Sequence, residues 1–436
     1  MEWYEAGALL LGMIIAGMAI GLPVAFSFLL TNVIGIFVFS GGWPVMSRIV
    51  QDATNLLTTF TLLPIPMFIL MGALFFQTGL AARVFDALDK LLGRLPGRLC
   101  FLTVMGGSLF STLTGSSMAN TAMLGSLLVP EMQRRGYSNR MAMGPILGTG
   151  GLAMIIPPSN LAVLLASVAN IDVGRLLVAG LIPGFLLAGL YVAMISLQLW
   201  RNPASAPSYD VPRTTAAEKI RSICVNLLPM ALIVVMVVGF IILGITTPSE
   251  AACFGVLGVI ILATAFRCLS RVAIRESLLS TIKTGGMVFF ILMNSTVFSQ
   301  LLAMSGASGG LIGWATAFQV SPFIILAAMF VILIALGMFM DPVSMILITA
   351  PIFFPLAVSF GFDPIWFAII VLMSLEMSQT TPPFGLLLYI MLGMVRKTTL
   401  FEVASAAAPF LLCDLILVML LVAFPTLALY LPRLMT

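Results

Sequence analysis

The sequence predicts an all-α polytopic membrane protein, and three observations carry this prediction. Hydrophobic residues make up 61% of the 436 residues, charged residues only 8%, and the mean hydropathy is +1.17. Soluble domains carry about a quarter charged residues, so this chain needs lipid as its solvent. Apolar stretches long enough to cross about 30 Å of hydrocarbon recur along the whole length. Two of these stretches have polar centres and two contain paired prolines, which predicts two re-entrant hairpins and two broken helices.

The N-terminal stretch is predicted to be a retained membrane span. Glu2 and Glu5 stand where a signal peptide would carry lysines, and Ala6 to Leu22 contains no charge. We therefore expect spans near 5–22, 23–41 and 61–79, with the N-terminus on the outer, periplasmic side.

Lysine and arginine mark the cytoplasmic side of a membrane protein, and here they form five clusters: Arg83, Lys90, Arg94 and Arg98; Arg134, Arg135 and Arg140; Arg201, Arg213, Lys219 and Arg221; Arg267, Arg271, Arg275 and Lys283; Arg396 and Lys397. The first two clusters flank an apolar stretch over 99–133. Two full spans of about 20 residues and a turn do not fit into it. We therefore predict a hairpin that enters from the cytoplasm and turns at Gly115–Asn120.

The rest of the chain then alternates across the membrane. We expect a broken helix over 139–171, a second hairpin over 320–358 that enters from the opposite face and turns at Met340–Pro342, and a second broken helix over 364–395. Arg48 and Arg175 are basic residues that this topology places outside. The predicted parts are scaffold spans (1–79), a first transport-domain repeat (80–171), central scaffold spans (172–283), a second transport-domain repeat (284–400) and a C-terminal span (401–436).

An internal repeat without gaps supports this division. Adding 225 to positions of the first half maps Pro130 onto Pro355, Gly136 onto Gly361, Pro157 and Pro158 onto Pro382 and Pro383, Leu161 onto Leu386, and Ser116 onto Asp341. Because the two hairpins enter from opposite faces, the repeat is inverted. Secondary transporters are often built in this way, with the binding site at the midplane where broken helices meet.

The hairpin turns and the proline pairs form the candidate site. A proline pair removes two amide donors and leaves nearby carbonyls without helical partners, while Gly, Ser and Thr allow tight turns and add hydroxyl oxygens. Such oxygens suit an alkali cation, and half-helix N-termini with side-chain amides suit an anion. Taken singly, the hydroxyls are also consistent with helix packing and the prolines with simple kinks.

Four acidic residues within apolar stretches leave alternatives open. Asp341 is a functional acid by its position, as a cation ligand or a proton carrier, or it caps a turn before proline. Glu376 and Asp414 are pathway carboxylates or polar links between helices. Glu250 follows Thr247 and is expected to cap a helix.

Several kinds of chemistry are excluded by what the sequence lacks. It has no histidine and no G-x-x-x-x-G-K-[ST] loop, which excludes histidine-based catalysis and metal sites and Walker-type ATP hydrolysis. We expect no enzymatic activity. The cysteines are scattered without a C-x-x-C pair and are expected to be free and buried; they are Cys100, Cys224, Cys253, Cys268 and Cys413.

At these motifs the sequence resembles the large membrane subunit of tripartite ATP-independent periplasmic (TRAP) transporters, the DctM-like family. The segments that carry the resemblance are GSSMANTAMLGSLLVPEM (115–132), IIPPSN (155–160), GITTPSEAACFG (244–255), MDPVSMILITAPIFFPL (340–356) and TTPPFG (380–385). The resemblance implies a bacterial inner-membrane protein that takes up carboxylates or sulfonates by sodium symport, with an elevator-type motion. It implies two partners, a small four-helix membrane subunit and a periplasmic substrate-binding protein.

Similarity to the related divalent anion–sodium symporters implies that Ser-Asn-Thr hairpin turns build the sodium sites. Ala119-Asn120-Thr121 matches two of these three residues, and Asp341 replaces the serine expected from the repeat. The resulting candidate sodium ligands, largely through backbone carbonyls, are Gly115, Ser116, Ser117, Asn120, Gly151, Ile156, Pro158, Gly337, Asp341, Ser344, Met377, Thr380 and Thr381. The candidate substrate contacts are Ser117, Asn120, Thr121, Ser159, Asn160, Ser344 and Thr381.

The same resemblance and the order of the spans indicate how the partners are arranged. Because no extra N-terminal spans precede the first one, we expect the small subunit to be a separate chain. No soluble domain interrupts the spans, so substrate recognition is expected to begin on another protein, and no nucleic acid is expected to bind. The alternatives are a stand-alone sodium/organic anion symporter and a channel, and two hairpins entering from opposite faces favour alternating access over a continuous pore.

Overall fold

The computed structural model describes residues 1–39, 42–92, 95–114, 117–207, 215–317, 320–395 and 398–435, and every regular element in these ranges is helical. The helices before the first hairpin are α1 (Trp3–Ala19), α2 (Val24–Phe39), α3 (Trp43–Leu57), α4 (Pro64–Gln77) and α5 (Leu80–Leu92). The first hairpin and broken helix comprise α6 (Arg98–Thr114), α7 (Ser117–Arg134), α8 (Asn139–Ile155) and α9 (Asn160–Ala169).

The central part of the chain continues with α10 (Val173–Ala179), α11 (Leu181–Arg201), α12 (Ala216–Ser222), α13 (Leu228–Ile242), α14 (Pro248–Ala265), α15 (Arg271–Met304) and α16 (Ala307–Ala317). The second hairpin, the second broken helix and the C-terminal helices are α17 (Pro322–Gly337), α18 (Pro342–Ser359), α19 (Pro364–Thr380), α20 (Leu386–Met394), α21 (Leu400–Ala423) and α22 (Thr426–Leu434). Short 3-10 turns lie at Phe60–Leu62 and Pro203–Ser205, and a π-helical turn at Ile223–Leu227 joins α12 to α13.

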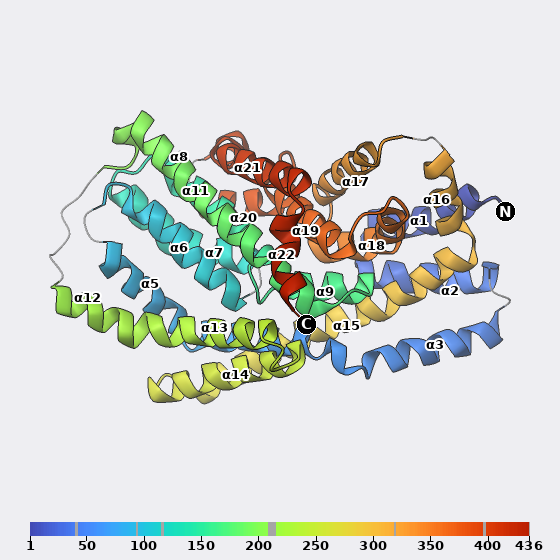
Figure 1. Cartoon of the computed structure of the whole chain (residues 1–436), viewed down its shortest axis with the longest axis horizontal. Helices are drawn as coiled ribbons and strands as arrows, with labels where there is room; N and C mark the ends of the chain where they lie inside the picture. The colour runs from blue at the N-terminus through green and yellow to red at the C-terminus, as the bar shows by residue number, and fades with distance from the viewer. Residues whose placement is uncertain are drawn as a thin grey trace.

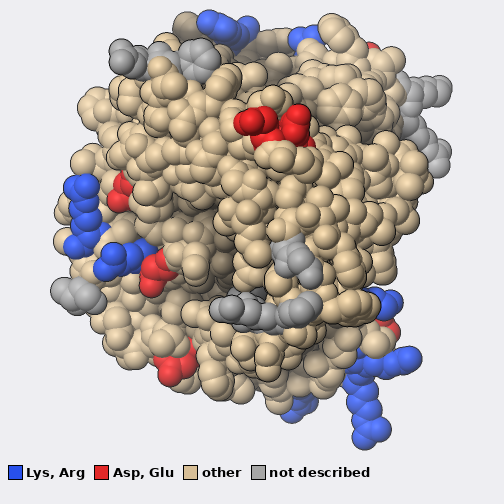
Figure 2. Space-filling model, turned by 90° about the vertical axis from the view of Figure 1, so that its right-hand side faces the viewer, with Lys and Arg blue, Asp and Glu red and all other residues tan. Residues whose placement is uncertain are grey.

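Within the described ranges, seven helical segments are long and apolar enough to cross a membrane, or eight if α8 and α9, bent by 43°, count as one span. Helices α1 and α2 are equally apolar but slightly shorter. Figure 2 shows that charged side chains on one face of the molecule are few and separated by broad uncharged areas. The predicted class, an all-helical multi-pass membrane protein, is confirmed.

Each predicted hairpin stretch consists of two helices that pack on each other, α6 with α7 and α17 with α18. The turn residues Gly115 and Ser116 lie outside the described residues. Pro322 and Pro342 begin their helices at the position where a missing amide costs nothing.

Both predicted helix breaks are present at the proline pairs. Helix α8 ends at Ile155 and α9 begins at Asn160, while α19 ends at Thr380 and α20 begins at Leu386. In each break the bond between the two prolines is cis. Since a proline has no amide hydrogen to donate, the helical hydrogen bonds cannot continue through either pair.

The helix boundaries repeat with the same offset as the sequence motifs. Adding 225 to the bounds of α7 gives the bounds of α18, and adding 225 to the bounds of α8 gives the bounds of α19. Gly136 and Gly361 follow α7 and α18 with φ values of 81° and 80°, a conformation that glycine adopts without steric cost.

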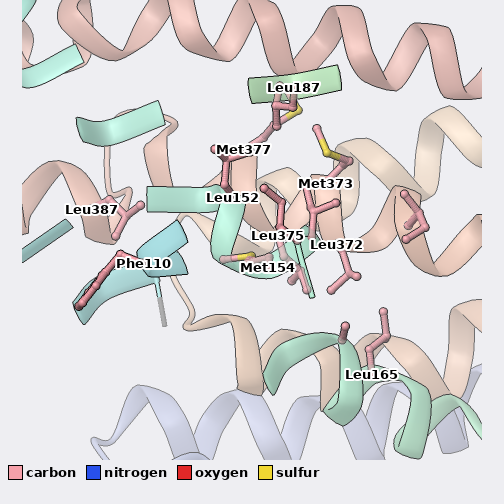
Figure 3. Close-up of a cluster of buried hydrophobic side chains, with 14 of the residues drawn as sticks. Phe110, Leu152, Met154, Leu165, Leu187, Leu372, Met373, Leu375, Met377 and Leu387 are labelled. Carbon is pink, nitrogen blue, oxygen red and sulfur yellow. The ribbon is translucent and has the colours of Figure 1, made fainter. Parts of the chain in front are cut away.

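Helices α8 and α19 cross at the centre of the molecule and carry much of its core. Helix α8 contacts α6, α7, α11, α19 and α21, while α7 packs on α20 and α18 packs on α9 (Figure 1). Figure 3 shows the apolar side chains at this centre, drawn from helices that lie on both sides of the two breaks. Gly144 and Gly148 of α8 allow Phe410 of α21 to pack directly on the helix backbone, a close approach that small residues permit in membranes.

Helix α15 is continuous for 34 residues and packs along α2, α3, α4 and α18 (Figure 1). The stretch 225 positions earlier, 46–79, is instead divided between α3, the 3-10 turn and α4. Pro64 and Pro66 lie in the first turn of α4, where they prevent one helix from running through.

The cysteines are free, as the sequence predicts. Cys100 and Cys413 are buried, but Cys224 is exposed, so the expectation that all are buried was wrong. Cys224 lies in the π-helical turn before α13, where few helices cover it.

Candidate functional site

A cavity of about 180 Å³ lies where the two hairpins meet the two helix breaks. Helices α4 and α15 close its remaining side. Its described lining comprises Ser117 and Met118 of α7, Asn160, Leu161 and Leu164 of α9, Asp341, Pro342 and Val343 of the second hairpin, Gln379 of α19, Ile65 and Ile69 of α4, and Thr284 and Val288 of α15. The structure thus brings three predicted site residues together, Ser117, Asn160 and Asp341.

Three helices begin at this cavity, α7 at Ser117, α9 at Asn160 and α18 at Pro342. A helix N-terminus carries a partial positive charge and unbonded amide groups, which attract anions. Asp341 is the single charged residue in the described lining. The cavity therefore offers amide dipoles to an anion and one carboxylate to a cation.

Asp341 caps helix α18. One carboxylate oxygen accepts hydrogen bonds from the backbone amides of Val343, at 3.1 Å, and Ser344, at 3.2 Å. The other oxygen accepts from the Ser344 hydroxyl. Capping is a property that asparagine shares, but Asp341 also borders the cavity, where its charge is available to a bound ion.

The predicted residues Ser117, Asn120 and Thr121 at the start of α7 form one polar corner, of which Ser117 lines the cavity. Asn120 is fully buried and donates a hydrogen bond of 3.1 Å to the carbonyl of Thr149 in α8. The hydroxyls of Ser117 and Thr121 are buried and have no hydrogen-bond partner among the described residues. Since a buried polar group without a partner is costly, these oxygens fit an alkali cation that would satisfy them.

The second predicted set is already hydrogen-bonded within the protein. The hydroxyls of Thr380 and Thr381 donate to the carbonyl of Met377, at 3.2 and 2.6 Å. Gly337 lies against the side chain of Ser378. The two corners therefore differ in their chemistry, although their helices follow in the same order and α7 and α8 have the lengths of α18 and α19.

Other predicted residues serve the first break and do not line the cavity described here. The Ser159 hydroxyl accepts from the amide of Ala162 and donates to the carbonyl of Met154 across the break, at 2.7 Å. Ile156 and Pro158 are buried inside the break. Gly151 lies against Glu376, and a side chain at that position would overlap the Glu376 carboxyl group.

Glu376 and Asp414 form a polar link between helices. The hydroxyl of Tyr191 in α11 lies 3.1 Å from a carboxyl oxygen of Glu376 in α19 and 2.5 Å from one of Asp414 in α21. All three side chains are buried, and none lines the cavity between the hairpins. Of the two alternatives for these acids, the structure shows the link. The expected helix cap is also present, because Glu250 and Thr247 form a capping box at the start of α14.

Ten of the thirteen described lining residues are not among the predicted ligands and substrate contacts. Gln379 lies three residues before the second proline pair and is almost fully buried, so its place in a polar segment was a usable signal. Thr284 is the first residue of an apolar stretch and follows Lys283. Ile65, Ile69 and Val288 are ordinary apolar residues of spans, and nothing in their sequence context distinguishes them.

Residues that are 225 positions apart touch each other where α8 crosses α19. Gly151 contacts Glu376, and the side-chain amide of Gln379 lies 3.9 Å from the sulfur of Met154. Both pairs join a residue to its own counterpart in the repeat.

Comparison with known proteins identifies similar membrane transport proteins over nearly the whole chain. The family described as "Tripartite ATP-independent periplasmic transporter, DctM component" matches residues 11–427. The C4-dicarboxylate TRAP transporter large permease protein of Pseudomonas aeruginosa is 33% identical over 375 residues, covering 86% of each chain. The sialic acid TRAP transporter large permease protein of Vibrio cholerae is 29% identical over 429 residues, covering 97% of each chain.

A similar fold occurs in a solved membrane-protein structure. The YdaH transporter of Alcanivorax borkumensis superimposes with a TM-score of 0.62 at 16% identity, covering 87% of this chain and 88% of that one. At this identity the likeness concerns the fold alone. Together with the family match and the similarity to the Pseudomonas permease, the helix order and the two breaks lead to one conclusion: this chain belongs to the DctM family, the large permease components of tripartite ATP-independent periplasmic transporters.

Proposed function

We propose that this chain is the permease subunit of a sodium-coupled, binding-protein-dependent secondary transporter that imports small organic acids, carboxylates or sulfonates, across the bacterial inner membrane. The observation that carries the proposal is the cavity where three helix N-termini meet Ser117, Asn160 and Asp341. Its amide dipoles suit a carboxylate, and its size suits a small molecule. The relatives named for C4-dicarboxylates and for sialic acid both handle carboxylic acids.

The two halves are proposed to be an inverted repeat that moves as an elevator. Equal helix bounds at an offset of 225 support the repeat. Contacts between Gly151 and Glu376 and between Met154 and Gln379 are those expected when a twofold axis passes through the crossing of α8 and α19, because residues on such an axis meet their own counterparts. A site on this axis is equally accessible to both sides in alternation.

Sodium is proposed to bind at the two hairpin corners. At the first corner the hydroxyls of Ser117 and Thr121 are free to turn toward an ion, with Asn120 holding the turn on α8. At the second corner Asp341 and the Met377 carbonyl supply oxygen atoms. A bound sodium ion supplies positive charge beside the organic anion. Among the described lining residues no lysine or arginine does so.

Two partners complete the proposed transporter. A small four-helix membrane subunit, as a separate chain, is proposed to pack on the permease within the bilayer, and a periplasmic binding protein is proposed to deliver the substrate. A periplasmic N-terminus is proposed as the orientation, and the basic clusters, which mark the cytoplasmic side, support it.

Uptake is expected to require an inward sodium gradient. Proteoliposomes that contain all three components should accumulate a labelled dicarboxylate or sialic acid when sodium is outside, and should fail to do so when choline replaces it at the same membrane potential. Equal accumulation in sodium-free medium would contradict sodium coupling. Uptake by the permease alone would instead support the stand-alone symporter.

The charge of Asp341 is expected to contribute to sodium affinity. Asp341→Asn keeps the cap of α18 but removes the charge, so the sodium concentration for half-maximal uptake should rise about fivefold or more, the factor that corresponds to roughly 1 kcal/mol between unit charges about 4 Å apart even in water. Substrate affinity at saturating sodium should change little.

Measuring uptake against sodium at two pH values separates the three roles of Asp341. A pure cap predicts unchanged curves at both pH values, which would rule out the charged-ligand role. A proton carrier predicts that the variant loses its pH dependence and keeps its sodium response.

A further inference from the structure

A second cavity, of about 260 Å³, lies apart from the site between the hairpins. It is bounded by the end of α9, the second half of α15 and the middle of α18. Its described lining comprises Ser167, Val168, Ala169 and Asn170; Ser295, Thr296, Ser299 and Gln300; and Ala350, Pro351, Phe354 and Pro355. Half of these residues carry a hydroxyl or an amide, and none is charged.

The polar residues of this cavity lie in segments that are apolar enough to cross a membrane. Helix α15 and helix α18 both meet that criterion, yet Ser299 is exposed and Gln300 is half-exposed. Polar groups that reach lipid carry a high cost and are tolerated at that depth beside a water-filled cavity. The exposed hydroxyl and amide therefore indicate that this cavity holds water.

A hydroxyl of α15 bonds to the backbone of α18 at the edge of this lining. Pro351 has no amide hydrogen, so the carbonyl of Leu347, four residues earlier, has no helical donor. The buried hydroxyl of Ser295 donates to it instead, at 3.4 Å. This hydrogen bond joins α15 to α18 beside the second cavity, which Ser295 and Pro351 both line.

Helix α15 joins the two cavities along one face. Thr284 and Val288 line the site cavity, and Ser295 and Ser299 line the second one. Spacings of four, seven and four residues place these side chains on the same side of a helix. At about 1.5 Å per residue, Ser295 lies roughly 10 Å along the helix from Val288.

We propose that the second cavity is an outer vestibule, in which the hydrated organic acid is held weakly before it reaches the site between the hairpins. This inference rests on the proposed function. The amides of Asn170 and Gln300 and the hydroxyl of Ser299 can donate hydrogen bonds to a carboxylate. Because no lysine or arginine is among the described residues that line the cavity, the stronger charge-assisted bonds are lacking there, and the anion leaves readily.

The vestibule opens to the outer side of the membrane. The stretch from Thr284 to Val395 contains no lysine or arginine, and it includes α18 and the relevant half of α15. Basic residues mark the cytoplasmic side, so their absence over this stretch assigns the cavity to the opposite side.

The test introduces a cysteine at Ser299 in a chain whose accessible cysteines, Cys224, Cys253 and Cys268, are replaced by serine. Right-side-out vesicles with all partners are treated from outside with two impermeant methanethiosulfonates of similar size, the anionic sulfonatoethyl reagent and the cationic trimethylammonioethyl reagent. We expect S299C to be labelled from outside by both. The anionic adduct should lower the uptake rate about tenfold more than the cationic one, because like charge in a narrow cavity repels the arriving substrate.

The matched control is S359C, at the exposed end of α18 and outside the cavity. It should be labelled from the same side and keep its uptake with either adduct. Labelling of S299C from inside only, or no labelling while S359C reacts, would overturn the vestibule. Labelling of S299C with unchanged uptake would overturn its place on the substrate route. The proposed function is tested by a separate measurement, because sodium-independent uptake by the untreated parent chain would contradict it. The labelling of S299C and S359C is measured without transport and therefore tests the vestibule alone.

Discussion

Replacing Asn120 with alanine is expected to abolish sodium-driven uptake. The Asn120 side chain is fully buried and donates a hydrogen bond from α7 to the carbonyl of Thr149 in α8. Its loss removes the hydrogen bond between the hairpin turn and the helix that precedes the first break, and a buried polar group left unsatisfied costs about 1–3 kcal/mol. Ser117 and Thr121 lie in the first two turns of the same helix. Without the hydrogen bond to Thr149, this end of α7 is no longer held on α8, and the two hydroxyls lose their fixed position toward an ion. We expect uptake to fall by more than about tenfold, which corresponds to about 1.4 kcal/mol.

Membrane insertion and assembly should survive this change. Asn120 lies at one turn, and the remaining contacts of α7 with α6, α8 and α20 are intact. Ser126→Ala is a suitable control, because Ser126 is an exposed hydroxyl on the same helix that donates to its own backbone. Uptake rates and the yield of folded protein in detergent should be compared for both variants. Normal uptake by Asn120→Ala would show that the turn of hairpin 1 serves helix packing and not ion binding.

A methyl group at Gly151 is expected to damage the protein at its centre. The Cβ atom of Gly151→Ala would overlap the side chain of Glu376, so either this buried side chain leaves its contact with the Tyr191 hydroxyl or α8 and α19 shift where they meet. Overpacking of this kind costs about 1–3 kcal/mol and displaces the two helix breaks relative to each other. Both the thermal unfolding midpoint in detergent and the rate of uptake should fall.

Two further variants separate this effect from a general intolerance of alanine. Gly189→Ala in α11 adds the same methyl group where nothing lies within 4 Å, and it should leave both measurements unchanged. Glu376→Asp combined with Gly151→Ala shortens the opposing side chain by one methylene and should recover part of the stability. If Gly151→Ala matched Gly189→Ala, the close crossing of α8 and α19 would not be required.

The features that break helices were predictable from the sequence, because they depend on local chemistry. The pairs Pro157-Pro158 and Pro382-Pro383 remove amide donors wherever they occur, so the ends of α8 and α19 followed from the residues alone. The offset of 225 reflects helix lengths and loop lengths, which the positions of proline and glycine record. For the same reason Ser117, Asn160 and Asp341 were found, since each begins or caps a helix at a break or turn.

The features that depend on contacts between distant helices were not predictable. Tyr191 gave no signal, and its hydroxyl meets Glu376 and Asp414 only because three helices converge. Ile65 and Val288 line the cavity because α4 and α15 pack beside the hairpins, and an apolar residue in a span looks the same whether it faces lipid or a cavity. Hydrogen bonds within the Thr380–Thr381 corner likewise required the folded backbone.

Because α15 is one unbroken helix, it fixes the angle between the side chains that line the first cavity and those that line the second. Each residue turns a helix by about 100°, so one residue more or fewer between Val288 and Ser295 would rotate the hydroxyls of the second cavity away from the side that faces the first. The corresponding stretch of the other half is interrupted at 58–63, where a change in length is absorbed by the turn. The two halves therefore differ in their tolerance of insertions and deletions. In the second half, α15 keeps its side chains in register over the full 34 residues. In the first half, a change of length before Pro64 is absorbed, because a new helix begins at Pro64.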